Sequence, residues 1–211
     1  MTPRYDWQGT RSAPCCLIDE MKKMDRWKRI SIFLTHVSNG WVALIALVIF
    51  GLFIGLALPL QSAQARAGMP GAGSPDMSIL YSADDLYRMA QTYGEPGRAL
   101  YIRARFTFDL IWPLVYVFFL ATATSWVNRK AFTENSPWHL TNLAPLVGGL
   151  FDYLENLSAS LVMFRYPAHT AVVDIIAPLF TLAKWVMLGG SFLFLIAGIV
   201  LAIFRSLSTT H

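Results

Sequence analysis

The chain has 211 residues, of which 55% are hydrophobic and only 14% are charged. Soluble domains carry about a quarter charged residues, so this composition excludes a disordered chain and argues against a soluble globular domain. The two cysteines, Cys15 and Cys16, are adjacent, which argues against a disulfide framework or a cysteine zinc site. The net charge of +4 is small, and no nucleic-acid partner is expected.

The first apolar run, 41–60, contains no charged residue and follows a basic segment, 1–40. Its length matches the roughly 30 Å hydrocarbon core of a bilayer, so it predicts a membrane-spanning helix. A cleaved signal peptide is an alternative, because Ala63 and Ala65 fit a signal-peptidase site. An uncleaved anchor is favoured, since the apolar region of a cleaved signal usually has about 7 to 15 residues.

The segment 61–105 predicts a linker rich in Gly, Ala, Ser and Pro, followed by an amphipathic helix on the outer membrane surface. Ser82 suits the N-cap of this helix, Asp85 lies in its first turn, and Gly94 is expected to end it. A second helix is expected to begin near Pro96 and to continue into the next span.

Three further apolar runs complete an all-α, integral membrane four-helix bundle with one exoplasmic amphipathic helix. The predicted spans lie at 106–127, 140–164 and 171–204, with a cytoplasmic loop at 128–139, an outer loop at 165–170 and a tail at 205–211. Basic residues flank the predicted cytoplasmic ends, so the positive-inside rule puts both termini in the cytoplasm. The expected location is the inner (plasma) membrane of a bacterium.

Ionisable residues inside these spans are the most informative feature of the chain, because each costs roughly 2.5 to 3.5 kcal/mol to insert. Steps of three or four residues put them on one face of each helix, and lipid cannot satisfy such a face. The three polar stripes should therefore face inward and meet. They comprise Tyr101, Arg105, Asp109, Trp112 and Tyr116; Gly148, Gly149, Asp152, Glu155 and Asn156; and Asp174, Pro178, Thr181, Lys184, Leu188 and Ser191. The pairs Gly148-Gly149 and Gly189-Gly190 are expected to allow close helix contacts.

Three functions of this cluster stay open. In the first, a pocket binds or transforms a small hydrophobic or lipid-like molecule, and Asp152 and Glu155 are candidate proton-transfer residues, because neighbouring carboxyls tend to differ in protonation. Its candidate ligand-binding residues are Tyr101, Arg105, Asp109, Trp112, Tyr116, Tyr153, Asn156 and Lys184. In the second, the residues form a salt-bridge network that only holds a structural or assembly protein together. In the third, they line a proton or ion pathway.

No cofactor is expected, since the chain contains no P-loop, dinucleotide fingerprint or nucleophile elbow. Oxygen ligands from Asp109, Asp152, Glu155 and Asn156 would suit Mg²⁺ or Ca²⁺, but no aspartate-rich motif accompanies them, and no metal site is predicted. The expected partners are membrane lipid and a small hydrophobic ligand. The sequence leaves open whether the protein is an enzyme and how many copies assemble.

Three segments carry a family resemblance: Gly97-Arg98-x-x-Tyr101, Phe108-Asp109-x-x-x-Pro113-x-x-Tyr116 and Phe151-Asp152-Tyr153-x-Glu155-Asn156. Together they resemble a group of bacterial four-span membrane proteins of unassigned function. The order of acid, proline and tyrosine in the second span is also similar to the EXPERA group of sterol isomerases and sigma-2-receptor proteins. That resemblance implies acidic residues in a lipid-accessible cavity. The chain differs from the group in having no acid in its first span and no histidine in any span.

Overall fold

The structure, a computed structural model, describes residues 25–69, 71, 73–134 and 136–208. Within these ranges it is helical and contains no strand, which confirms the all-α class. The helices are α2 Arg26–Val37, α3 Gly40–Leu52, α4 Leu58–Gly68, α5 Ala83–Arg105, α6 Phe108–Ala131, α7 Ala144–Arg165 and α8 Val173–Ser208. A π-helical turn, η1 Phe53–Ala57, joins α3 to α4, and two 3-10 turns are η2 Pro75–Met77 and η3 Pro137–Leu143. Most of the predicted basic segment 1–40 lies outside the described residues.

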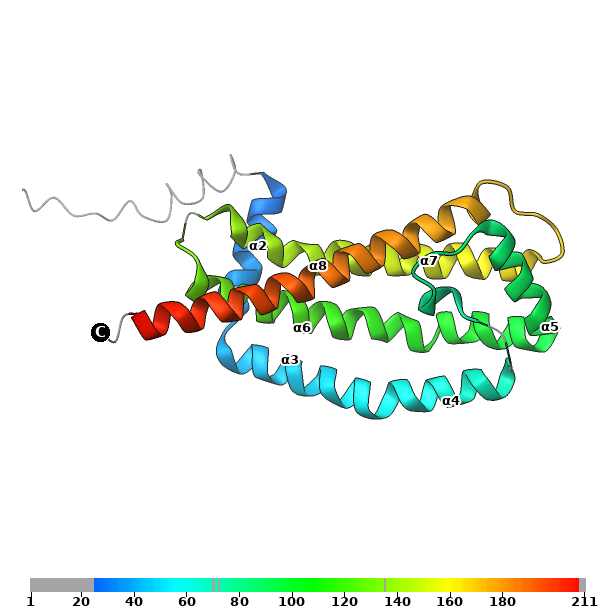
Figure 1. Cartoon of the computed structure of the whole chain (residues 1–211), viewed down its shortest axis with the longest axis horizontal. Helices are drawn as coiled ribbons and strands as arrows, with labels where there is room; N and C mark the ends of the chain where they lie inside the picture. Colours follow the sequence, from blue (N-terminus) through cyan, green and yellow to red (C-terminus); the bar gives the residue numbers. More distant parts are fainter. Residues whose placement is uncertain (1–24, 70, 72, 135, 209–211) are drawn as a thin grey trace, which may run out of the picture.

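The long helices run along one another (Figure 1). Helix α6 packs against both α7 and α8, and α3, η1 and α4 form one continuous helix beside α6. Helix α5 covers one end of the bundle, next to α7, while α2 and η3 lie at the other end. Ala63 and Ala65, the two residues of the signal-peptidase motif, lie inside the helical turns of α4.

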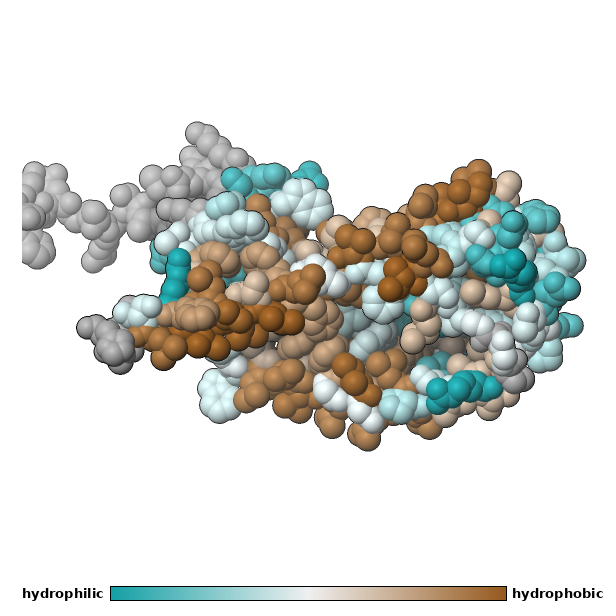
Figure 2. All heavy atoms as spheres, viewed as in Figure 1, coloured by the Kyte–Doolittle hydropathy of each residue, from teal (hydrophilic) through white to brown (hydrophobic). Residues whose placement is uncertain are grey.

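Three helical stretches are long and apolar enough to cross a membrane: Gly40–Gly68, which is α3 with η1 and α4; Ala83–Ala131, which is α5 with α6; and Val173–Ser208, which is α8. Apolar side chains cover the visible surfaces of α3 and α8, whereas polar side chains gather at the end that α5 covers (Figure 2). Helix α7 is not among the three, and it is the helix that carries Asp152, Glu155 and Asn156. The fourth span therefore stays a prediction.

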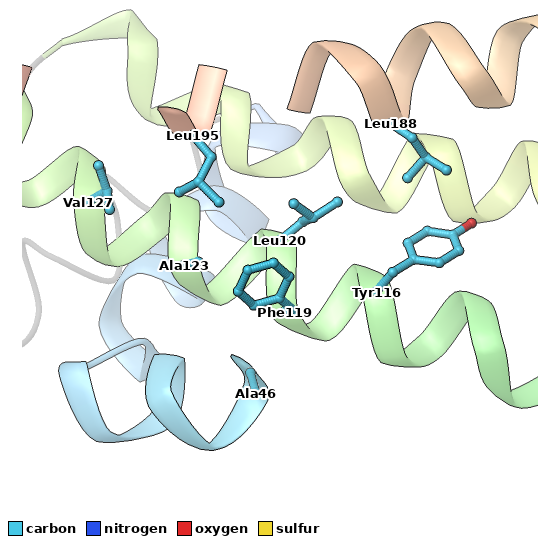
Figure 3. Close-up of a cluster of buried hydrophobic side chains, with 8 residues drawn as sticks. All are labelled: Ala46, Tyr116, Phe119, Leu120, Ala123, Val127, Leu188 and Leu195. Carbon is cyan, nitrogen blue, oxygen red and sulfur yellow. The ribbon is translucent and has the colours of Figure 1, made fainter. Parts of the chain in front are cut away.

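Most residues of the predicted inward-facing stripes are buried, whereas Arg105, Trp112 and Pro178 are half-buried. On α8, Asp174, Thr181 and Lys184 are all at most 7% exposed, and Leu188 and Ser191 continue the same buried face. Apolar residues from α3, α6 and α8 fill the adjacent core, shown in Figure 3. The three-to-four-residue spacing thus identified the packed side of the helix correctly.

Helix α5, the predicted outer helix, begins at the expected N-cap but packs against the protein and not on the membrane surface. Ser82 caps α5 in a reciprocal capping box with Asp85, and Gly94 adopts a positive φ of 63° that kinks the helix, as the sequence indicated. Its apolar face, however, packs against the protein. Leu86 and Ala90 are fully buried in a cluster with residues of α7 and α8, so this face is not available to the membrane surface.

The helix expected to run from Pro96 through the second span is interrupted. Helix α5 ends at Arg105 and α6 begins at Phe108. The Thr107 hydroxyl donates to the Arg103 carbonyl oxygen at 2.7 Å, which provides a partner for a carbonyl left free at the helix end. The break lies beside the polar stripe, so two separate helices contribute its residues.

The two glycine pairs behave differently. A Cβ on Gly149 would lie 2.7 Å from Val117 Cγ2, and one on Gly148 would lie 3.3 Å from Met187 Cβ. Around Gly189 and Gly190, nothing among the described residues lies within 4 Å of such a Cβ. The close approach predicted for the first pair is confirmed, and that predicted for the second is wrong.

Substitution of leucine for Gly149 or for Gly190 tests whether the first glycine, and not the second, lies in a close helix contact. We expect Gly149→Leu to lower the free energy of unfolding by about 2 kcal/mol relative to Gly190→Leu, because the added side chain overpacks the contact between α6 and α7. Both variants gain similar helix propensity, so Gly190→Leu is the matched control. Thermal unfolding in a nonionic detergent measures the difference. Equal Tm values for the two variants would contradict the packing.

Candidate functional site: a buried ion cluster

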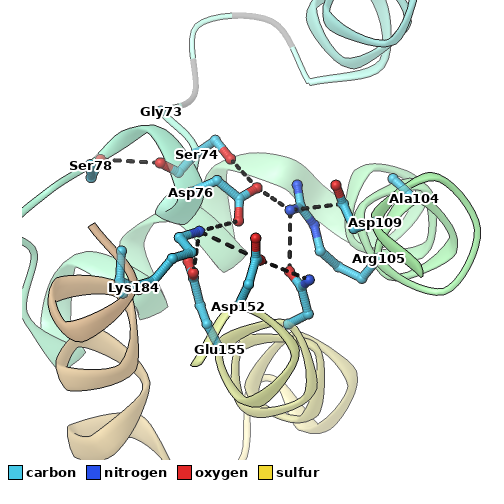
Figure 4. Close-up of polar contacts among 12 residues, drawn as sticks. Gly73, Ser74, Asp76, Ser78, Ala104, Arg105, Asp109, Asp152, Glu155 and Lys184 are labelled. Atoms are coloured by element: carbon cyan, nitrogen blue, oxygen red, sulfur yellow. Dashed lines mark hydrogen bonds and ion pairs between the residues drawn. The ribbon is translucent and has the colours of Figure 1, made fainter. Parts of the chain in front are cut away.

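Four segments of the chain bring charged residues together near the α5 end of the bundle. We call this group the ion cluster; its members are Asp76, Arg105, Asp109, Asp152, Glu155, Asn156 and Lys184. Figure 4 shows the charged members converging from η2, from the junction of α5 and α6, from α7 and from α8. The sequence predicted all of them except Asp76.

Lys184 is the central cation of the deeper half. Its side chain is 5% exposed and contacts the carboxylate of Glu155, whose side chain is fully buried. The Lys184 Nζ also lies 3.7 Å from an oxygen of Asp152 and 3.7 Å from an oxygen of Asp76. Glu155 Oε2 is the oxygen in contact with Lys184, whereas Oε1 has no hydrogen-bond partner among the described residues.

Arg105 is the cation of the outer half. Its guanidinium contacts Asp76, lies 2.9 Å from Asp109 and donates to the Asn156 side-chain oxygen at 3.4 Å. It also lies over the ring of Tyr101, 4.5 Å from the centroid, a cation–π arrangement. The hydroxyl of Tyr101 is buried and has no hydrogen-bond partner among the described residues. One cation therefore joins α5, α6, α7 and η2.

Uncharged donors orient Asp152. The Tyr116 hydroxyl donates to one carboxylate oxygen at 2.8 Å, and the Asn156 amide donates to the other at 3.2 Å. Both donors come from predicted stripes, one on α6 and one on α7. Asp152 is therefore held by hydrogen bonds and lies at a greater distance from Lys184 than Glu155 does.

Asp76 enters the site from the linker, which the sequence analysis assigned no site residue. The Trp185 indole donates to the Asp76 carbonyl oxygen at 3.2 Å, and the Tyr93 hydroxyl donates to that of Gly73 at 2.6 Å. These bonds hold the 73–78 loop across the ion cluster, and Figure 4 shows the Asp76 carboxylate between Arg105 and Lys184. The local sequence signal is a turn-forming Ser74-Pro75-Asp76, which predicts a bend and no tertiary partner.

The Asp76 carboxyl is the outer anion of the cluster, and its side chain is 19% exposed. Burial raises its pKa, but the positive charges of Arg105 and Lys184 outweigh burial and hold this pKa below its ordinary value. The carboxylate is therefore ionised at neutral pH and keeps the loop attached.

Lowering the pH should weaken the ion pairs by which Asp76 holds the 73–78 loop on the ion cluster. A carboxyl whose pKa is lower in the folded state stabilises the protein above its unfolded pKa of about 3.9, and that stabilisation is lost as the pH falls through the folded value. We expect Asp76→Asn to lower stability by about 2 kcal/mol at pH 7 and the difference from wild type to shrink below about pH 4. Tm values of both proteins across this range measure it. A difference that grows on acidification would contradict the assignment.

The charges of the ion cluster do not balance. It contains four carboxyl groups but only two cations within the described residues. Fully ionised, it would hold two more negative than positive charges in a site from which water is largely excluded. Unpaired buried charge costs several kcal/mol per ion, so the cluster has to acquire positive charge, either as protons or from a bound group.

Two predicted ligand-binding residues do not contact the ion cluster. Trp112 stacks on Phe50 and Phe53 at 5.9 Å and meets the ring of Tyr116 edge-on at 5.6 Å. Tyr153 donates to the Leu110 carbonyl oxygen at 2.8 Å. Trp112 thus belongs to an aromatic group beside the cluster, and Tyr153 to the contact between α6 and α7.

Asp174 is also separate from the ion cluster, because it accepts a hydrogen bond from the Tyr87 hydroxyl at 3.1 Å. Among the described residues, no group of three or more His, Cys, Asp or Glu side chains has an arrangement that could hold a metal ion. The carboxyls of the ion cluster are instead directed at Arg105 and Lys184.

Comparison of the chain with protein-family models, with curated proteins and with solved structures finds no match. The site must therefore be interpreted from its own chemistry.

Proposed function

We propose that the protein is a four-span protein of a bacterial inner membrane, with both termini in the cytoplasm. Support for α7 as the fourth span comes from its two faces. Asp152 and Glu155 are buried, whereas Leu150, Leu157 and Phe164 are each at least 57% exposed. A membrane-spanning helix must bury its polar side chains in the protein and expose apolar ones to lipid, and α7 does so despite its lower hydropathy.

We propose further that the ion cluster binds the positively charged group of a small amphipathic molecule, such as an amine carrying an apolar chain. The observation that carries this proposal is the excess of two carboxyl groups over cations. A network that only holds helices together gains nothing from unbalanced buried charge. A group with one positive charge supplies one of the two missing charges, and a proton on Asp152 or Glu155 supplies the other. When the site is empty, protons on both carboxyls keep it neutral.

The aromatic group of Phe50, Phe53 and Trp112 provides a surface for the apolar part of the ligand. It reaches the ion cluster through Tyr116, which Trp112 contacts and which donates to Asp152. Phe53 begins the π-helical turn η1, and such turns occur frequently at functional sites. Polar and apolar binding surfaces therefore adjoin, as recognition of an amphipathic molecule requires.

A structural network is the second candidate, because Arg105 and Lys184 together connect five helical elements, α5, α6, α7, α8 and η2. A pathway for protons or ions is less favoured, because it would need ionisable residues along the whole bundle. On the half of the bundle away from the ion cluster, the buried polar residues of α6 and η3 are all uncharged, namely Thr122, Thr124, Ser125, Asn128 and Asn142.

Thermal unfolding with chosen amphiphiles tests the proposed function. The full chain in a nonionic detergent is heated with dodecylamine, which is cationic at pH 7, and in parallel with the neutral dodecanol. At a free amine concentration of 100 times Kd, the stabilisation is about 2.7 kcal/mol, which raises Tm by several degrees. Dodecanol should produce little change.

Two matched variants localise the effect. Asp152→Asn removes an acid of the ion cluster, while Asp174→Asn removes a buried acid that pairs with Tyr87 elsewhere. The amine-dependent rise in Tm should shrink in the first variant and persist in the second. Equal shifts with amine and alcohol, or no shift with either, would contradict recognition of a cation and favour the structural network.

A further inference from the structure

A second candidate binding site lies between α3, α6 and α8, away from the ion cluster. It is an apolar groove of about 430 Å³, whose lining includes Ala43 and Leu47 on α3, Ala123 and Trp126 on α6, and Leu195 and Ile199 on α8. On α6, these residues lie toward the C-terminal end, whereas Asp109 lies in the first turn. The groove and the ion cluster are therefore at different depths of the bundle.

Small side chains create the groove. Ala43 and Ala123 leave room between the larger neighbours Leu47 and Phe119, which also line it. Gly40, at the start of α3, brings that helix against the Trp126 indole, since a Cβ on Gly40 would lie 3.4 Å from the indole nitrogen. The result is an apolar groove lined by aliphatic and aromatic side chains of three helices, which suits a hydrocarbon chain.

Positive charge lies at one end of the groove. The Lys130 ammonium is 4.2 Å from the centre of the Trp126 ring, and Lys130 is exposed. The neighbouring Arg129 contacts the Ser38 carbonyl oxygen, which brings the end of α2 to the same region. The exposed residues Arg26, Lys28 and Arg29 lie at the other end of α2 from Ser38. Lys130 is therefore the cation next to the groove, at the expected cytoplasmic surface.

We propose that the groove holds an acyl chain of an anionic phospholipid and that Lys130 binds its phosphate. The groove suits the acyl chain of such a lipid, which requires an apolar site. Lys130 suits its headgroup, which requires a cation next to that site. The proposal is independent of the function proposed for the ion cluster, since the two sites share no residue.

Lipid retention tests the proposal. The full chain is reconstituted in vesicles of equal phosphatidylglycerol and phosphatidylcholine, extracted in mild detergent and analysed by native mass spectrometry. We expect wild type to retain phosphatidylglycerol with about fivefold preference, the effect of one cation at a membrane surface. Lys130→Gln should reduce the preference to near parity. Arg66→Gln, on α4 away from the groove, is the matched control and should leave it unchanged.

A second variant tests the groove itself. Ala43→Leu places a larger side chain in the groove and should reduce the number of retained lipids, with Lys130→Gln serving as the independent test if this variant folds poorly. Three outcomes would overturn the proposal: no retained lipid in wild type, retention without headgroup preference, or a dimer peak that Ala43→Leu removes. The last would show that a second copy of the chain occupies the groove.

Discussion

Replacing Lys184 with methionine is expected to destabilise the protein by about 3 to 5 kcal/mol, the usual effect of removing one partner of a buried ion pair. Lys184 contacts Glu155 and lies 3.7 Å from both Asp152 and Asp76. Without it, Arg105 is the one cation left for four carboxyls of the ion cluster. Thermal or denaturant unfolding in a nonionic detergent at pH 7 measures the loss.

A second substitution should restore part of this stability. Lys184→Met combined with Glu155→Gln removes both members of the closest pair, so the double variant should be more stable than Lys184→Met alone. Lys28→Met removes an exposed lysine on α2 and serves as the matched control, with an expected change of less than about 0.5 kcal/mol. If Lys184→Met unfolds at the same temperature as Lys28→Met, the ion cluster does not contribute as described.

The second large effect concerns ligand binding. The double variant Asp152→Asn, Glu155→Gln leaves Asp76 and Asp109 opposite Arg105 and Lys184, so the remaining charges balance. We expect the empty variant to be at least as stable as wild type, because the unbalanced buried acids are gone. Its affinity for dodecylamine should fall by about 2 to 5 kcal/mol, at least roughly 30-fold in Kd.

Titration calorimetry with dodecylamine measures this loss, and dodecanol again controls for apolar binding. The double variant discriminates between the two accounts of the site. A purely structural network predicts lower stability on loss of either acid. Unchanged amine affinity combined with reduced stability would therefore contradict the proposed function and support the structural alternative.

Helical spacing was sufficient to predict most of the site. Asp109, Asp152 and Lys184 belong to three separate helices, yet each had to face inward because lipid cannot pair a charge. The structure brings them into one cluster, as that argument requires. The capping residue Ser82 and the kink at Gly94 were also predictable, because they depend on neighbouring residues alone.

Features that depend on tertiary contacts were not predictable. Asp76 has no periodic partner in the sequence, and its position follows from bonds that Trp185 and Tyr93 make to the 73–78 loop. Nothing in the sequence indicated that the apolar side of α5, including Leu86, packs against the protein. By composition alone, α5 and the 73–78 loop could equally be placed in water, on the membrane surface or against the protein.

Native mass spectrometry of the full chain, purified in mild nonionic detergent from its membrane, shows directly whether the ion cluster carries a cationic ligand. We expect a co-purifying small molecule with a basic nitrogen, present in wild type and absent from the Asp152→Asn, Glu155→Gln variant. The Asp174→Asn variant should retain it. A folded wild-type protein that carries no small molecule, or one that carries a neutral or acidic molecule retained by the double variant, would contradict the claim that the ion cluster binds a cationic group.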